Sequence, residues 1–233
     1  RYAGKNLDLT GKLNEILTHL PTLQQLVVVP YANTSCTADD FQTEAKVECW
    51  EDFYQAEGEP SFTPVPFEQP LYILYSSGTT GVPKCIVHGA GGTLLQHVKE
   101  LGLHSDVGAD DTLFYYTTCG WMMWNWLVSG LALGATLVLY DGSPFHPEPT
   151  RLIDLIDAEE ISVFGTSAKF IAALEKAGAK PRETHKLSRL KAILSTGSPL
   201  AHESFDYVYR DIKTDVCLSV SYTHLRAHET KAN

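Results

Sequence analysis

Hydrophobic and polar positions alternate along this chain in short blocks, each with the spacing of one secondary-structure element. Apolar residues at 13–20 recur at helical spacing, and the proline that follows is expected to end this helix. The apolar run at 26–29 predicts a short buried strand. Residues 31–70 are rich in polar residues and proline, which predicts mainly loop with one helix near 49–54.

The alternation is regular in the rest of the chain. It predicts strands at 71–75, 85–87, 135–140, 161–164, 190–194 and 216–218. It predicts helices at 94–101, 121–133, 149–159, 170–178 and 205–209. Strands that alternate with helices in this way are typical of βαβ units, so we expect an α/β fold: a mostly parallel sheet with flanking helices. Ligands of such sheets bind beyond the carboxyl ends of the strands, which draws attention to the loops at 76–84, 165–167 and 195–199.

A membrane span is one possible interpretation of residues 112–140, which contain no charged residue. From residue 121 onward the stretch is long enough to cross a bilayer. However, Gly130 and Gly134 interrupt it, and no cluster of lysine or arginine flanks either end. We therefore expect a helix, a stop at Gly134 and a buried strand, and no membrane span.

Composition narrows the function classes. The 233 residues contain 28 acidic and 18 basic side chains, for a formal net charge of −10, which argues against a nucleic-acid partner. Five cysteines lie scattered without a Cys-x-x-Cys pair, so a disulfide framework or a zinc site is not expected. A reducing compartment fits this usage, and we expect the cytosol.

The most informative segment is a loop rich in serine, threonine and glycine between the strands predicted at 71–75 and 85–87. It contains Ser76, Ser77, Gly78, Thr79, Thr80, Gly81 and Lys84. Glycines allow close approach of the backbone, consecutive N–H groups can form an anion-binding concavity, and lysine adds a point charge suited to phosphate. The spacing is not that of a P-loop or of a dinucleotide-binding loop. Phosphate binding and a loop without a ligand both remain open from the composition of this segment.

The ordered string Tyr-Ser-Ser-Gly-Thr-Thr-Gly-Val-Pro-Lys at 75–84 closely resembles the phosphate-loop signature of the adenylate-forming synthetases, which include acyl-CoA synthetases, peptide-synthetase adenylation domains and luciferases. Three further strings resemble the acetoacetyl-CoA synthetase family within that group. They are Ile-Val-His-Gly at 86–89, Gly-Trp-Met-Met-Trp-Asn at 120–125 and Ser-Thr-Gly-Ser-Pro-Leu at 195–200. The resemblance runs from about residue 9 to residue 218.

The resemblance implies ATP-dependent ligation of acetoacetate to coenzyme A through an acyl-adenylate, with Mg²⁺ neutralising phosphate charge. It implies catalytic roles for Lys84 and Thr79, within an ATP-binding loop at 76–84. It implies nucleotide contacts from Gly197, Ser198 and Pro199. It implies acyl or coenzyme A contacts from Trp121, Thr166, Ser167 and Thr196, and no protein-held metal. The partners would be these small molecules.

Structural roles are open for several of these residues. Residues 197–200 could form only a strand-to-helix turn with Pro199 at the first helical position, and Ser167 could be only an N-cap. Trp121, Trp124 and Trp126 are expected mainly in the core, with one facing a ligand. His88 is expected to be a turn histidine, and the acidic pairs at 110–111 and 159–160 are expected to be solvated.

The resemblance stops at residue 218, which predicts a partial adenylation domain at 1–218. The string at 219–233 resembles translated sequencing adaptor, and we expect a non-native tail there. The later motifs of the family are absent, so the chain alone is expected to be inactive and prone to expose apolar strand edges. A short-chain acyl-CoA synthetase acting on acetate or propionate and a non-catalytic nucleotide-binding module are the alternatives.

Overall fold

The computed structural model describes residues 2–31, 37–54, 57–76 and 84–221, which form two compact units divided at Pro64. The smaller unit contains helix α1 (Thr10–Leu17), strand β1 (Gln25–Val28), the 3₁₀ turn η1 (Ala38–Asp40), strand β2 (Lys46–Cys49) and helix α2 (Trp50–Phe53). The predicted helix and strand at its start are confirmed, but the strand was expected to be buried and has no fully buried residue. β2 was expected to be loop, and that prediction is wrong because parallel pairing with β1, from Gln25 opposite Lys46, stabilises a four-residue segment with little apolar pattern.

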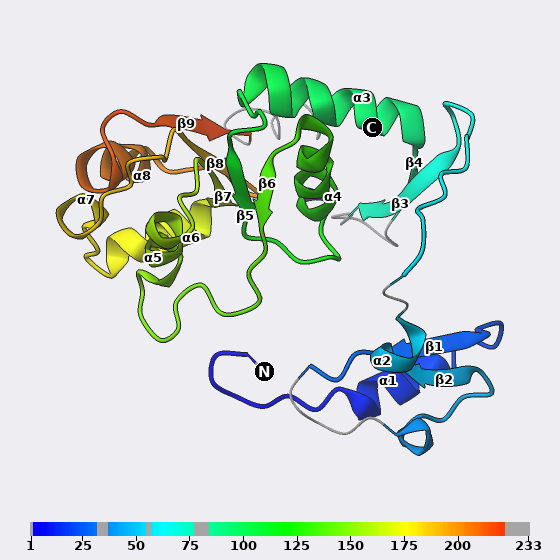
Figure 1. The fold of residues 1–233 in the computed structure, drawn as a ribbon. Coiled ribbons are helices and arrows are strands. Elements are labelled where there is room, and N and C mark those ends of the chain that lie inside the picture. The colour runs from blue at the N-terminus through cyan, green and yellow to red at the C-terminus, as the bar shows by residue number, and fades with distance from the viewer. Residues whose placement is uncertain (1, 32–36, 55–56, 77–83, 222–233) are drawn as a thin grey trace. The chain divides into compact units, whose positions relative to one another are not determined.

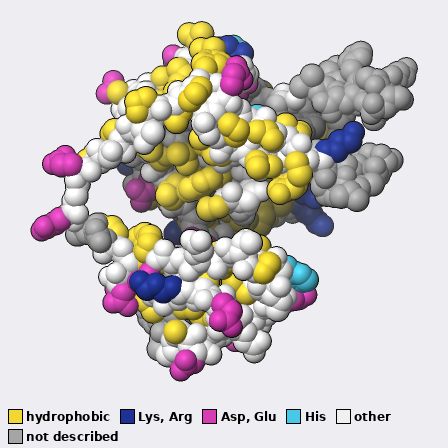
Figure 2. All heavy atoms as spheres, turned by 90° about the vertical axis from the view of Figure 1, so that its right-hand side faces the viewer, with side chains coloured by type: hydrophobic (Ala, Val, Ile, Leu, Met, Phe, Trp, Pro, Cys, Tyr) yellow, Lys and Arg dark blue, Asp and Glu magenta, His cyan; other side chains and the backbone are white. Residues whose placement is uncertain are grey.

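The larger unit opens with an antiparallel hairpin of β3 (Pro70–Ser76) and β4 (Lys84–Gly89). Helix α3 (Ala90–Val98) and the π-helical turn η2 (Lys99–His104) follow it (Figure 1). Hydrophobic side chains gather on the face of this unit shown in Figure 2. The exposed apolar side chains of the hairpin and α3 are Leu71, Ile73, Tyr75, Ile86, Val87, Leu94 and Leu95. Apolar surface on the strands was an expectation from the sequence.

A parallel sheet forms the rest of the larger unit, as the sequence predicts. Within the described residues its strand order is β6-β5-β7-β8-β9. The strands are β5 (Thr112–Tyr115), β6 (Thr136–Val138), β7 (Val163–Ser167), β8 (Ala192–Thr196) and β9 (Cys217–Val220). The pattern missed β5, because its four residues lie at the start of a long uncharged run and are stabilised by pairing with β6 and β7.

Helices cover both faces of the parallel sheet (Figure 1). One face packs against α4 (Met122–Val128) and the 3₁₀ turn η3 (Ser129–Leu133). The other packs against α5 (Arg151–Ala158), α6 (Ala168–Lys176), α8 (His202–Tyr207) and the π-helical turn η4 (Val208–Ile212), and the short helix α7 (Pro181–Thr184) contacts η4. β5 divides its side chains between the two cores: Leu113 and Tyr115 face α4, and Phe114 faces the opposite helices.

The predicted stop at Gly134 is confirmed, because this residue has a φ of +78° and ends η3 before β6. No helix among the described residues is long and apolar enough to cross a membrane. Strand β9 continues to Val220, which pairs with Ser195 of β8. The expected non-native tail therefore begins inside a strand, and most of it, from residue 222, lies outside the described residues.

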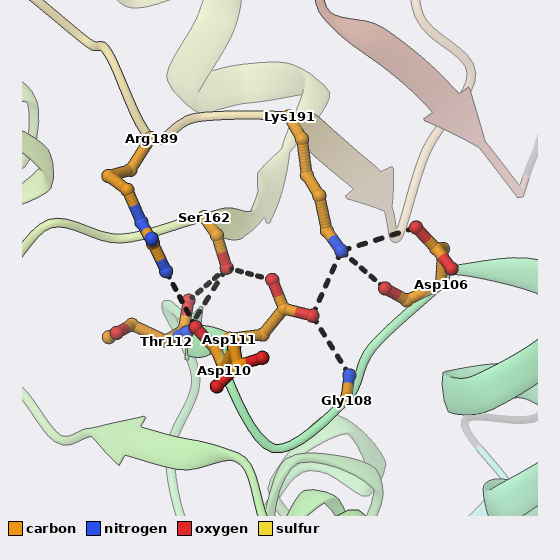
Figure 3. A network of polar contacts seen from close by, with 8 residues as sticks. All are labelled: Asp106, Gly108, Asp110, Asp111, Thr112, Ser162, Arg189 and Lys191. Atoms are coloured by element: carbon orange, nitrogen blue, oxygen red, sulfur yellow. Dashed lines mark hydrogen bonds and ion pairs between the residues drawn. The ribbon is translucent and has the colours of Figure 1, made fainter.

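A network of polar side chains joins the amino ends of β5, β7 and β8, as Figure 3 shows. Asp111 is at its centre. Its Oδ1 accepts a hydrogen bond from Ser162 Oγ at 2.7 Å, and its Oδ2 accepts from Lys191 Nζ at 2.9 Å and from the Gly108 N–H at 2.8 Å. Lys191 also donates to the carbonyl oxygen of Asp106. Three strand starts are thus held by one carboxylate.

The expectation that the pair at 110–111 is solvated is wrong for Asp111, whose side chain is only 12% exposed. Burial disfavours the charged forms of Asp111 and Lys191 alike. Hydrogen bonds from Lys191, Ser162 and Gly108 outweigh burial and hold the pKa of Asp111 below its usual value. Asp111 and Asp106 outweigh burial at Lys191 and raise its pKa. The pair therefore stabilises the fold from about pH 4 to about pH 10.

Replacing Asp111 by Asn should lower the free energy of unfolding by about 1–3 kcal/mol at pH 7, because charge-assisted hydrogen bonds are lost. Urea denaturation followed by tryptophan fluorescence measures this difference. The difference should shrink as the pH falls below about 4, where the wild-type carboxylate takes up a proton. The exposed neighbour gives the control: Asp110→Asn should change stability by less than about 0.5 kcal/mol. Equal effects of the two substitutions would contradict the role of Asp111.

Candidate functional site

The hairpin brings together the two ends of the predicted phosphate loop. Ser76 ends β3, Lys84 begins β4, and the two residues pair directly across the ladder. The Lys84 side chain is exposed. The other predicted loop residues, Ser77, Gly78, Thr79, Thr80 and Gly81, lie outside the described residues. A loop closed by an antiparallel pair is what an anion-binding turn between two strands requires.

A second group of predicted residues meets at the carboxyl ends of β7 and β8. Gly197 follows β8 with a φ of +92°, a backbone conformation that side-chain-bearing residues rarely adopt. A Cβ placed on Gly197 would lie 3.7 Å from Cζ2 of Trp121, so the indole lies against this turn. Helix α8 begins only at His202, so the alternative in which Pro199 is the first helical residue is wrong. The turn therefore extends from residue 197 to Ala201, which has an extended conformation and is the N-cap of α8.

Trp121 is the tryptophan that faces this turn. It is the N-cap of α4 and contacts the ring of Tyr115 edge-on, with ring centroids 6.0 Å apart. Trp126 is only 5% exposed and donates its Nε1–H to Glu100 at 3.1 Å. Trp124 is partly buried against the same core. The expectation that the tryptophans serve mainly the core, with one near the site, agrees with this arrangement.

Thr166 and Ser167 were expected in a loop, but both belong to β7. The strand continues because its ladder with β8 pairs Thr166 with Ser195 and Ser167 with Thr196. The expectation of an N-cap at Ser167 is confirmed, since its Oγ accepts from the Phe170 N–H at 3.3 Å.

The register divides the predicted acyl residues between two faces of the sheet. Val163 of β7 and Leu194 of β8 belong to the core on the α4 side. Ser167 and Thr196 lie an even number of residues further along the same strands, so they share this face with Trp121. Thr166 lies on the opposite face and is 1% exposed, and its Oγ1 has no hydrogen-bond partner among the described residues. Trp121, Ser167 and Thr196 therefore form one group with Gly197, from which the Thr166 side chain is excluded.

Thr196 makes a further contact at this edge. Its Oγ1 lies 2.5 Å from Ser221 Oγ, and the Ser221 N–H donates to the Ser195 carbonyl at 3.1 Å. Ser198 is half-buried, and Pro199 is exposed. The turn thus offers one exposed edge at the end of the sheet, where ligands of α/β folds bind.

Tyr115 was not predicted to lie near the site, and Gly165, in the segment singled out at 165–167, was given no role of its own. A Cβ on Gly165 would lie 2.0 Å from Cδ2 of Tyr115, so only glycine lets the ring cross β7. The Tyr115 hydroxyl donates to the Thr166 carbonyl at 3.3 Å, and burial raises its pKa, which keeps it a donor. The two adjacent tyrosines at 115–116 are typical of a strand and could have indicated one here. The strand was missed because these residues lie within the uncharged run.

Metal ligands are not grouped in the described part of the chain. No cluster of three or more His, Cys, Asp or Glu side chains there could hold a metal ion. His88 is in strand β4 rather than in a turn, so that expectation is wrong. The site that the structure assembles is therefore a glycine-containing turn, an indole and hydroxyl groups at the end of a parallel sheet, beside a hairpin that carries a lysine.

This combination defines an α/β fold of the type that binds ligands beyond its strand ends. The family model described as AMP-binding enzyme matches residues 7–219, and the chain belongs to this family.

Several proteins similar to this chain are named acetoacetyl-CoA synthetase. An acetoacetyl-CoA synthetase from Gallus gallus is 49% identical over 93% of this chain, and one from Rhizobium meliloti (strain 1021) is 52% identical over 94%. The solved acetoacetyl-CoA synthetase from Streptomyces lividans has a TM-score of 0.86 and 40% identity over 94% of this chain. This chain spans 33% of the length of each of these proteins.

Replacing Gly165 by Ala should lower the free energy of unfolding by about 1–3 kcal/mol, because the new methyl group overlaps the Tyr115 ring and forces repacking. Thermal unfolding followed by circular dichroism measures the loss. Gly92→Ala in α3 is the matched control: nothing lies within 4 Å of its added methyl group, so stability should stay the same or rise. An unchanged melting curve for Gly165→Ala would rule out the close approach.

Replacing Thr166 by Val should leave the free energy of unfolding unchanged or raise it by up to about 1 kcal/mol. Valine keeps the shape of threonine and removes a buried hydroxyl that lacks a partner among the described residues. Chemical denaturation at pH 7 gives the comparison, with Thr196→Val as the control, because that hydroxyl contacts Ser221. A loss above about 1 kcal/mol at Thr166 would mean that its hydroxyl is hydrogen-bonded in solution.

Proposed function

We propose that this chain forms the ATP- and acid-binding part of an acetoacetate–CoA ligase. The observation that supports this most directly is the hairpin that ends at Ser76 and resumes at Lys84 around a phosphate-loop sequence, in a chain 49–52% identical to acetoacetyl-CoA synthetases. The substrates would be ATP, acetoacetate and coenzyme A.

The reaction would proceed in two transfers. A carboxylate oxygen of acetoacetate attacks the α-phosphorus of ATP, the bond to the bridging oxygen breaks, and pyrophosphate leaves with its electron pair. The thiol of coenzyme A then attacks the acyl carbon, AMP leaves, and the thiol proton passes to solvent. A carboxylate is already ionised at pH 7, so the first transfer needs no general base.

The first transfer brings two anions together, and the main task of the protein is to stabilise the added charge. Lys84 would supply an ammonium, the loop at 76–84 would supply backbone N–H groups and hydroxyls, and Thr79 would contact the transferring phosphate. Mg²⁺ would arrive with the triphosphate and lower its charge, since no group of metal ligands lies in the described residues. Gly197, Ser198 and Pro199 would border the base.

The acyl group would lie on the α4 side of the sheet, near Trp121, Ser167 and Thr196, which share that face. The Thr166 side chain is buried on the opposite face, so Thr166 would act only through its main-chain carbonyl, which accepts a hydrogen bond from the Tyr115 hydroxyl. Scattered cysteines support a reducing compartment such as the cytosol.

In the complete polypeptide that carries this sequence, Lys84→Met should lower acetoacetate-dependent exchange of pyrophosphate into ATP by about a hundredfold, because one charge on the transition state is lost. The exposed Lys176→Met is the matched control and should keep full exchange. Exchange that is undiminished in Lys84→Met would refute the catalytic role. Exchange with acetate or propionate but not acetoacetate would favour a short-chain acyl-CoA synthetase. ATP binding by calorimetry without exchange for any acid would favour a non-catalytic nucleotide-binding module.

A further inference from the structure

A cavity of about 460 Å³ lies between the β3–β4 hairpin, α3 and the first turns of α4. We call it the hairpin pocket. Its lining includes Tyr72, His88, Thr93, His97, Glu100 and Asn125. None of these residues was assigned to the ligand site from the sequence.

The hairpin pocket is lined by two elements that also carry candidate site residues, strand β4 and helix α4. On β4, His88 and Lys84 point to the same face, because side chains alternate, and they lie about 13 Å apart along the strand. On α4, Asn125 lies about one helical turn after Trp121, which touches the Gly197 turn. A short acid whose carboxylate lies between Lys84 and Trp121 would thus have this cavity beside its other end.

The charge in the lining is negative. Glu100 accepts from Trp126 Nε1 at 3.1 Å and from Gln96 Nε2 at 2.5 Å, so both of its oxygens are used. Glu68 is a second carboxylate in the lining, and no lysine or arginine is among the described residues that line the pocket. A ligand with a second carboxylate would be repelled, because like charges at close range disfavour each other.

Hydrogen bonds link α3 to the main chain of α4 at Asn125. Ser129 Oγ donates its single proton to the main-chain carbonyl of Asn125 at 3.1 Å. His97 Nδ1 lies 2.9 Å from Ser129 Oγ, and because that hydroxyl has already donated its proton, His97 must be the donor. Burial, and the nearby His88, lower the pKa of His97 despite Glu100, so its imidazole is neutral at pH 7.

The polar groups left for a ligand are uncharged. The Asn125 side-chain amide is half-buried and makes no hydrogen bond within the described structure. Thr93 Oγ1 is buried and also has no partner among the described residues. A purely apolar ligand would bury these groups without partners, which costs about 1–3 kcal/mol for each.

We propose that the hairpin pocket selects the acid of the ligase: it accepts a short acid with an uncharged polar end, such as a 3-keto acid, and rejects alkyl acids and dicarboxylic acids. Asn125 is the specificity residue, because its amide N–H donates to the ketone oxygen. His97 is a positioning residue, because it acts on Asn125 through Ser129. This proposal rests on the ligase function proposed above and adds the basis of its selectivity.

Asn125→Leu in the complete polypeptide tests the specificity residue. The ratio of kcat/KM for acetoacetate to kcat/KM for butyrate, which has a methylene in place of the ketone, should fall at least about tenfold. The KM for ATP should not change. Leu95→Ala, on the exposed side of α3, is the control and should keep the wild-type ratio.

Two variants of His97 separate positioning from a general effect on folding. His97→Leu should lower the acetoacetate-to-butyrate ratio of kcat/KM, whereas His97→Asn, which keeps a donor N–H toward Ser129, should retain most of it.

The unchanged protein offers a test that needs no variant. Its kcat/KM for malonate should be at least about a hundredfold below that for acetoacetate, because Glu68 and Glu100 line the pocket.

An unaltered acetoacetate-to-butyrate ratio in Asn125→Leu, with pyrophosphate exchange intact, would overturn the pocket proposal and leave the ligase function standing. Use of malonate as readily as acetoacetate would overturn it in the same way. Absence of exchange with every acid in the unchanged protein would reject the ligase function itself, and the pocket proposal with it.

Discussion

The placement of the candidate site depends on how the parallel strands are held at the opposite end of the sheet. Asp111 binds Ser162, Lys191 and a backbone N–H, and so joins the starts of β5, β7 and β8. Strands β7 and β8 then run side by side for five residues, and their carboxyl ends bring Ser167 opposite Thr196. A shift by one residue would exchange the faces of the sheet and move both side chains away from Trp121.

The same register explains why adjacent hydroxyl residues in the sequence have different surroundings. Thr166 and Ser195 lie among the helices of one face, and both are nearly fully buried. Ser167 and Thr196 lie on the other face, where Gly165 lets the Tyr115 ring cross the sheet. Alternation along two strands therefore defines the acyl side of the proposed ligase, and the rings of Trp121 and Tyr115 lie on the same face of the sheet.

Much of the architecture follows from local pattern. The alternation after residue 140 predicts β7, β8 and β9 and the helices between them, because apolar spacing differs between strand and helix. The glycine at 134 predicts the end of η3, since a left-handed residue there suits glycine. The pattern failed for β2 and β5, where pairing with a neighbouring strand, rather than local spacing, stabilises the element.

The sequence by itself determined the α/β class, the family resemblance and the loop at 76–84, because these depend on residue types in a fixed order. Only the tertiary structure decided that Asp111 is an internal ion-pair partner, that Thr166 and Ser167 face opposite ways, and that Asn125 borders a cavity with His97. These are properties of contacts between segments distant in the chain. Local spacing carries no record of such contacts, because burial and partners arise only when the elements pack together.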